Sequence, residues 1–197
     1  MKLLLARHGQ TDWNAVLHIQ GSTDTDLNET GRQQARLLGQ RLLEQSIALE
    51  GIAVSTMRRA RQTADIAGQM LGICPTVLDG LEEMCMGRWE GLSWYEVRAQ
   101  YPAEYAAWDK SPRHIPAPGG ECYQDVLNRF VPALQKIAAQ ARGDWLVVTH
   151  SGNIAALLAE IHGIPFREVG AHYKIRNAEW LCVDAGSLSA KTPFLRA

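Results

Sequence analysis

The chain has 197 residues, which argues for one domain, with or without an insertion, and against a multidomain assembly. A hydrophobic content of 46% and a charged content of 21% exclude the disordered and fibrous classes. The net charge of -1, from 20 basic and 21 acidic residues, gives no general attraction to nucleic acid or to an anionic membrane, so we expect neither as a partner.

The first predicted element is a short buried strand at residues 3–6. Its apolar run stops at Arg7 and His8, which makes it too short for the hydrophobic part of a secretion signal. A polar loop follows, and then Thr30 and Gln33 have the spacing of a capping box. We therefore predict a helix from this point, with an apolar face formed by Ala35, Leu38 and Leu42.

The same alternation of short apolar runs and helical periodicity continues along the chain. We expect strands at residues 52–54, 145–149 and 178–183, and helices at residues 58–71, 126–141 and 153–162. Strands separated by helices predict an α/β fold, a three-layer sandwich with a largely parallel central sheet and helices on both faces. In such a sheet, ligands bind beyond the carboxyl ends of the strands.

Residues 92–120 interrupt this pattern with many aromatic residues and prolines. Their composition predicts a short helix within an irregular, lid-like insertion. The aromatic side chains of Trp94, Tyr101 and Trp108 could either face a ligand or pack as core. The sequence leaves both interpretations open.

Several classes of site are disfavoured by missing motifs. The four cysteines contain no C-x-x-C pair, which fits neither a zinc site nor a disulfide scaffold and favours a reducing compartment. No H-E-x-x-H motif and no nucleotide-binding glycine loop occurs, so we expect neither a metal nor a cofactor. No window approaches the roughly 18 apolar residues of a membrane span, so we expect a soluble cytoplasmic protein. A homodimer is the commonest option, although the sequence does not indicate the oligomeric state.

Polar residues follow three of the predicted strands. Arg7, His8 and Gly9 come after the first, residues 55–59 after the second, and the segment from His150 to Gly152 after the strand at 145–149. Because the carboxyl ends of parallel strands meet at one edge of a sheet, two histidines and at least two arginines could converge there. Guanidinium groups and loop N–H groups are the donors that bind phosphate, so this edge predicts an anion site.

Residues 58–64 place three arginines in the first turns of a helix, where the helix dipole disfavours a cation by about 0.3 to 1 kcal/mol. A bound anion would reverse that effect for an arginine facing it, but periodicity does not decide among Arg58, Arg59 and Arg61.

Glu82 and Glu83 precede an apolar segment that could half-bury a carboxyl group for general-acid chemistry. An acidic pair in a loop is also an ordinary solvated feature, so spacing alone does not assign it.

The residues from Leu5 to Asn14 closely resemble the R-H-G-x-T-x-x-N opening of the histidine phosphatase, or phosphoglycerate mutase-like, superfamily. Further matches follow in the same order and span nearly the whole chain: Gln20-Gly21, Ser55-x-x-x-Arg59-Ala60, Glu83-x-x-x-Gly87-x-Trp89-Glu90-Gly91 and Thr149-His150-Ser151-Gly152. The resemblance implies one domain over residues 1–197, with the insertion at about 92–120.

The resemblance also implies a role for each matching residue. His8 would be the nucleophile that becomes phosphohistidine, Arg7, Arg59 and His150 would clamp the phosphoryl oxygens, and Glu83 would donate a proton to the leaving group. His8 then needs one unprotonated ring nitrogen, with the other donating to a backbone carbonyl, whereas His150 facing phosphate would favour its charged form. The implied substrate-binding residues are Asn14, Gln20, Gly21, Ser151 and Gly152.

The expected function is therefore metal-independent hydrolysis of a small phosphorylated metabolite, as in the compact phosphatase branch with α-ribazole phosphatases and broad-specificity phosphatases. A mutase dependent on 2,3-bisphosphoglycerate is the alternative. The mutase continuation resembles E-R-H-Y-G-G-L, whereas this chain reads E-M-C-M-G-R-W from Glu83, and its insertion holds no paired arginines. A non-catalytic module that binds phosphorylated ligands is a third hypothesis, disfavoured because every implied catalytic group is present.

Overall fold

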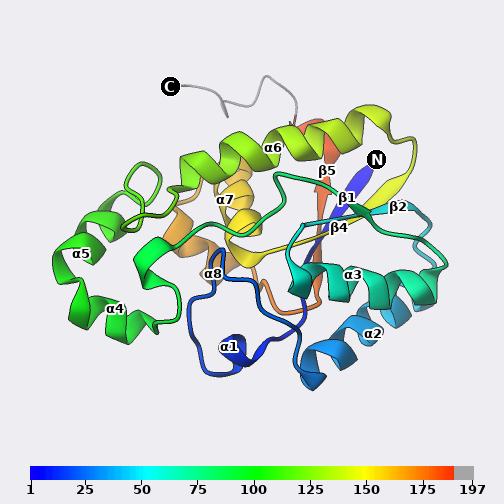
Figure 1. Ribbon diagram of the computed structural model, residues 1–197. Coiled ribbons are helices and arrows are strands. Elements are labelled where there is room, and N and C mark those ends of the chain that lie inside the picture. The colour runs from blue at the N-terminus through cyan, green and yellow to red at the C-terminus, as the bar shows by residue number, and fades with distance from the viewer. Residues whose placement is uncertain (189–197) are drawn as a thin grey trace.

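The computed structural model describes residues 1–188, so residues 189–197 of the predicted domain lie outside the described part of the chain (Figure 1). The described residues form a five-stranded sheet. Its strands are β1 (Lys2–Arg7), β2 (Leu49–Val54), β3 (Thr76–Val77), β4 (Asp144–Thr149) and β5 (Trp180–Asp184). The helices are α1 (Asp12–Ala15), α2 (Glu29–Glu44), α3 (Arg58–Leu71), α4 (Trp94–Gln100), α5 (Pro102–Lys110), α6 (Tyr123–Gln140), α7 (Ser151–His162) and α8 (Val169–His172), with 3₁₀ turns η1 (Gly87–Trp89), η2 (Phe166–Glu168) and η3 (Ala185–Leu188).

The strand order is β3-β2-β4-β1-β5. Strands β3, β2, β4 and β1 are parallel neighbours, and only β5 runs antiparallel, beside β1. The sheet is therefore largely parallel, as predicted. This order places the carboxyl ends of β1, β4 and β2 next to one another at one edge of the sheet (Figure 1).

Alternating side chains of the central strands point into two separate apolar layers. On one face, Leu4 and Ala6 of β1 pack with residues of α2 and α3, among them Leu38 and Ala64. On the other face, Leu3 and Leu5 belong to a larger core with residues of α6 and α7. Helices therefore cover both faces, which is the predicted three-layer arrangement and explains why the central strands are apolar on both sides.

Several predicted boundaries are wrong. Helix α2 begins at Glu29 because Asn28 caps it, with its side-chain oxygen accepting from the Gly31 N–H at 2.9 Å, so Thr30 and Gln33 form no capping box at its start. Helix α7 begins at Ser151, two residues before the predicted start, with His150 as its N-cap residue. The last strand covers Trp180–Asp184, and the two-residue β3 was not predicted.

The insertion at residues 92–120 contains two helices, α4 and α5, where one was expected. Trp89 is fully buried beside them, and its ring lies 6.1 Å from that of Trp94 and 5.6 Å from that of Trp108, centroid to centroid. Trp94 and Trp108 also line the cavity described below. Trp94 and Trp108 therefore both pack against Trp89 and face a cavity, whereas Tyr101 packs against the core without lining that cavity.

The cysteines at positions 74, 85, 122 and 182 are all free. Among residues 1–188, no helix is long and apolar enough to cross a membrane.

Candidate active site

The three strand ends bring two histidines together. His8 follows β1 and His150 follows β4, and because these strands are parallel neighbours the two rings lie 5.2 Å apart between centroids, tilted by 55°. Arg59 reaches the same place from the first turn of α3, which follows β2. His8 and His150 are 2% and 0% exposed, so both lie inside the protein rather than on its surface.

The environment of His8 fixes its tautomer. Its Nδ1 lies 2.6 Å from the carbonyl oxygen of Gly9, which can only accept, so Nδ1 carries the proton and Nε2 is left with a lone pair. Burial, followed by the positive charges of Arg59 and Arg7, holds the pKa of His8 well below its ordinary value. His8 therefore presents a neutral ring with an unprotonated nitrogen, which is the state a nucleophile needs.

Gly9 cannot be replaced without moving this turn. A Cβ at Gly9 would lie 2.5 Å from the carbonyl oxygen of Gly31. The backbone N–H of Gly9 donates to Thr63 Oγ1 at 2.9 Å. The carbonyl that orients His8 is thus held between α2 and α3.

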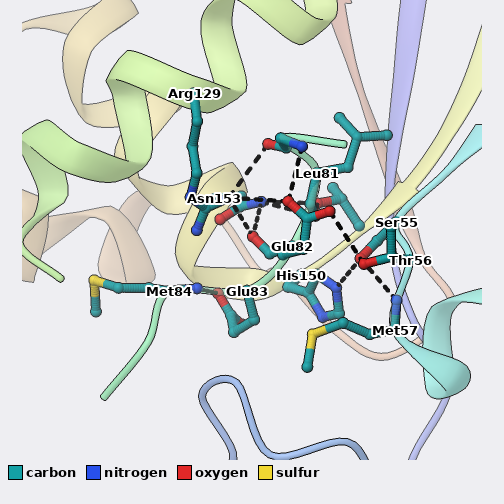
Figure 2. Close-up of polar contacts among 12 residues, drawn as sticks. Ser55, Thr56, Met57, Leu81, Glu82, Glu83, Met84, Arg129, His150 and Asn153 are labelled. Atoms are coloured by element: carbon teal, nitrogen blue, oxygen red, sulfur yellow. Dashed lines mark hydrogen bonds and ion pairs between the residues drawn. The ribbon is translucent and has the colours of Figure 1, made fainter. Parts of the chain in front are cut away.

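His150 is oriented by the loop after β2. Its Nε2 lies 2.9 Å from the hydroxyl oxygen of Ser55, as Figure 2 shows, while its Nδ1 is buried with no partner among residues 1–188. Burial, then Arg59 and His8, lowers the pKa of His150 well below its ordinary value. We expected a charged ring facing phosphate, but the protein alone favours the neutral form, so charging His150 requires the anion itself.

The buried Arg59 and the half-buried Arg7 present further unpaired donors. Arg59 donates from Nη1 to the Thr23 carbonyl at 2.8 Å and from Nη2 to the Gly21 carbonyl at 2.9 Å, and Arg7 donates from Nη1 to the Ile175 carbonyl at 3.1 Å. The Nε groups of both arginines are buried without a partner among the described residues. Burial lowers the pKa of each, and the nearby carboxylate of Glu83 partly offsets this effect.

The structure separates the three candidate arginines of α3. Arg59 is 0% exposed and faces the histidines, whereas Arg58 and Arg61 are exposed. Arg58 pairs with Asp24 and Asp26, each at 3.1 Å. Arg58 therefore forms surface ion pairs, Arg61 is exposed, and only Arg59 belongs to the site.

Glu83 is positioned by the amino end of α7. Its Oε1 accepts from the Met84 N–H at 3.0 Å and the Gly152 N–H at 3.1 Å, and its Oε2 lies 3.4 Å from the Ser151 hydroxyl. The neighbouring Glu82 points elsewhere and accepts from the Thr56 hydroxyl at 3.1 Å. Glu83, and not Glu82, thus lies at the start of α7 and lines the same cavity as His8.

Two residues that we did not predict hold the loop that carries Glu83 (Figure 2). Asn153 donates from Nδ2 to the carbonyls of Leu81 at 3.0 Å and Glu82 at 2.7 Å. Arg129 of α6 donates to the Glu82 carbonyl at 2.6 Å. No sequence signal marks such contacts, because their acceptors are backbone carbonyls far away along the chain.

A third unpredicted residue, Glu90, organises the loop after Gln20. Its carboxylate accepts from the N–H and hydroxyl of Ser22, both at 2.8 Å, from the N–H and hydroxyl of Thr23 at 2.9 and 2.6 Å, and from the Met86 N–H at 3.0 Å. The same loop supplies the carbonyls that hold Arg59. Glu90 belongs to the family-like motif at residues 83–91, which was the available signal.

A cavity of about 750 Å³ adjoins the residues of the site. The five expected substrate-binding residues line it, namely Asn14, Gln20, Gly21, Ser151 and Gly152. Arg7, His8, Arg59 and Glu83 line it as well, whereas His150 is fully buried beside His8 and is not among the lining residues. Of the expected binding residues, Gln20 has its side-chain oxygen engaged by the hydroxyls of Thr11 and Thr25.

Within residues 1–188, no group of three or more His, Cys, Asp or Glu side chains is placed to hold a metal ion. The site instead combines cationic and neutral nitrogen donors with one carboxyl group. This combination suits a phosphoryl group, since its oxygens accept hydrogen bonds and its charge is balanced by arginine.

Comparisons with known proteins agree with this chemistry. A family model described as histidine phosphatase superfamily (branch 1) matches residues 3–188. A glucosyl-3-phosphoglycerate phosphatase from Mycolicibacterium vanbaalenii is 34% identical over 189 residues, covering 91% of this chain and 82% of that protein. A metal-independent phosphoserine phosphatase from Arabidopsis thaliana is 34% identical over 164 residues, covering 81% and 68%. The solved structure of Bacillus stearothermophilus YhfR has a TM-score of 0.81 and 32% identity, covering 100% of this chain and 98% of that one.

Proposed function

The chain belongs to the histidine phosphatase superfamily, and on that premise we propose that it hydrolyses small phosphomonoesters through a phosphohistidine formed on His8. One observation carries the proposal. Three buried nitrogens without a partner among residues 1–188, Arg7 Nε, Arg59 Nε and His150 Nδ1, belong to residues close to His8, whose Nε2 is unprotonated. Buried polar groups are rarely left unpaired, and a bound phosphoryl group would supply the acceptors that these nitrogens lack.

In the first step, Nε2 of His8 attacks phosphorus opposite the ester oxygen. The P–N bond forms as the P–O bond to the leaving alcohol breaks, and Glu83, entering the step protonated, gives its proton to that oxygen. The guanidinium groups of Arg7 and Arg59, with the Nδ1–H of His150, balance the charge on the equatorial oxygens. The hydrogen bond from His8 Nδ1 to the Gly9 carbonyl stabilises the positive charge that develops on the ring.

In the second step, water attacks the phosphohistidine. Glu83, now a carboxylate, takes a proton from that water while the P–N bond breaks and His8 recovers its lone pair. Inorganic phosphate then leaves. Both steps use residues of this chain alone, so we propose that the reaction needs neither a metal nor a cofactor, as the name of the phosphoserine phosphatase relative states for that protein.

We also propose roles for the surroundings of the site. Asn14, Gln20, Gly21, Ser151 and Gly152 would shape the phosphoryl end of the cavity, since all five line it. Residues 92–120 would form a lid-like wall within a single domain. Relatives named for glucosyl-3-phosphoglycerate and phosphoserine support a small phosphorylated metabolite as substrate.

The test is hydrolysis of para-nitrophenyl phosphate in the presence of EDTA, combined with rapid acid-free quenching to trap radiolabelled phosphoenzyme. Wild type should turn over the ester and carry label, His8→Ala should do neither, and His172→Ala, which changes an exposed histidine, should behave as wild type. Full turnover by the His8→Ala variant would overturn the proposal, as would loss of wild-type turnover in EDTA that added metal restores.

A mutase is the second candidate, favoured by one relative. A 2,3-bisphosphoglycerate-dependent phosphoglycerate mutase from a Methylobacterium species is 34% identical over 169 residues. Adding 2,3-bisphosphoglycerate together with 3-phosphoglycerate distinguishes the two activities. We expect release of inorganic phosphate, whereas formation of 2-phosphoglycerate far faster than hydrolysis would establish the mutase instead.

A further inference from the structure

The cavity extends well beyond the phosphoryl site. Its volume of about 750 Å³ lies in the upper part of the range for sites that enclose drug-sized ligands, about 300 to 1,000 Å³. His8, Arg7 and Arg59 are only three of its lining residues, and the volume exceeds what a phosphoryl group fills. Other parts of the lining are therefore available to the leaving group of the substrate.

Those walls are largely aromatic and sulfur-containing. Trp94 and Trp108 stack at 5.3 Å between ring centroids with an angle of 29°, and Tyr123 and Phe166 stack with an angle of 25°. All four rings line the cavity, together with Met84 and Met86. Aromatic faces and flexible thioethers favour an apolar or ring-bearing group over a strongly hydrated one.

The exposed residues that line the cavity have an excess of positive charge. Arg167, Lys174 and Arg176 line it and are exposed. Arg176 lies 3.8 Å from Glu179. The side chains of Arg167 and Lys174 make no ion pair or hydrogen bond with any residue in 1–188. Among the described residues of the lining, Glu83 is the only acidic residue.

These two features are not needed for the phosphoryl group itself. Arg7 and Arg59 already face the phosphoryl site, while Arg167 and Lys174 come from the segment around η2 and α8 and lie at the opening. Building on the proposed phosphatase activity, we propose that the preferred leaving group is amphipathic. It has an apolar ring that packs against Trp94, Trp108 and Phe166, and a second acidic group that binds Arg167 and Lys174.

The charge half of this proposal is tested with two matched esters, para-carboxyethylphenyl phosphate and para-propylphenyl phosphate. Both release a phenol whose acidity is insulated from the substituent, so they differ mainly in the distal charge. Exposed ion pairs contribute about 0.2 to 1 kcal/mol each, so wild type should show a kcat/KM about two- to thirtyfold higher for the carboxylated ester. Molar sodium chloride should remove most of that preference.

The double variant R167Q/K174Q should bring the ratio of the two kcat/KM values close to one. The matched control R61Q/K136Q removes one exposed arginine and one exposed lysine outside the cavity lining and should retain the wild-type ratio. Equal kcat/KM for both esters in wild type would overturn the inference and leave the phosphatase proposal intact. Absence of turnover of both esters would refute the phosphatase proposal and this inference with it.

The apolar half is tested with cyclohexylmethyl phosphate and ethyl phosphate, which release alcohols of similar acidity. Burial of the extra methylene groups should raise kcat/KM for the cyclohexylmethyl ester by about tenfold or more. Replacing the exposed face of the wall with Trp94→Ser should reduce this advantage several-fold. Equal rates for the two alkyl esters would show that the aromatic wall does not contact the leaving group, and would overturn the proposal.

Discussion

Replacing Gly152 with alanine places a methyl group where the carboxyl group of Glu83 lies. A Cβ at Gly152 would lie 2.5 Å from Glu83 Oε1, whereas ordinary contact begins at 3.4 Å. The carboxyl group must therefore retreat by about 0.9 Å, and a misplacement of about 1 Å at a reacting group costs about a hundredfold in rate. The backbone N–H that donates to Glu83 is retained, so the change acts on position rather than on charge.

The effect should depend on the leaving group, because a proton donor matters most for a poor one. For alkyl phosphates we expect kcat to fall about a hundredfold, and for para-nitrophenyl phosphate, whose phenolate leaves unaided, by less than about fivefold. Steady-state kinetics over a series of esters with graded leaving-group acidity would measure this as a steeper dependence of rate on acidity in Gly152→Ala.

A double-mutant cycle separates this mechanism from general damage. In a Glu83→Ala background the Gly152→Ala change should alter the rate with alkyl esters by less than about twofold, because the group it displaces is already absent. The melting temperature of each variant provides the folding control. Equal losses for alkyl and aryl esters, or a full hundredfold loss in the Glu83→Ala background, would refute the reasoning.

Three further predictions follow from hydrogen bonds and buried charge. Glu90→Gln should lower the free energy of unfolding by about 2 to 3 kcal/mol after allowance for partial exposure, because the two bonds from Thr23 lose their carboxylate acceptor; an unchanged urea midpoint would contradict this. Asn153→Ala should reduce kcat about tenfold with alkyl esters by loosening the loop before Glu83, yet still allow phosphoenzyme to form from aryl esters, which quench-flow labelling can check. The pKa values of His8 and His150 are lowered in the folded state, so below about pH 6.5 the unfolded chain binds more protons than the folded one. The free energy of unfolding should therefore fall as the pH drops from there, by up to about 2.7 kcal/mol per pH unit for the two groups. Urea titrations should show a shallower pH dependence for His150→Asn, and an equal slope in both proteins would reject the assignment.

The central strands and the residues that end them are predictable from sequence for a simple physical reason. A strand buried on both faces is a continuous apolar run, so the first polar residues after it mark its carboxyl end, as Arg7 and His150 do here. Parallel topology then places such ends together. The start of α2 was less predictable because Asn28 and Thr30 are both good capping residues, and only the observed bond to the Gly31 N–H distinguishes them.

The supports of the site are less visible because their partners are distant in sequence. Periodicity did not distinguish Arg59 from its exposed neighbours, since the first turn of α3 presents arginines in several directions. The resemblance made that choice. Arg129 and Asn153 bind backbone carbonyls 47 and 71 residues away, and every residue type offers such a carbonyl, so no residue pattern encodes them.

The unpaired donors beside His8 also bear on how the enzyme behaves at the end of its cycle. On the proposed mechanism, inorganic phosphate would bind the same three nitrogens as the substrate, without the leaving group that the rest of the cavity would hold. Inhibition by the product would follow from this shared site. By mass action the same ion would stabilise the folded chain against heat, so the enzyme would be most stable when it is most inhibited.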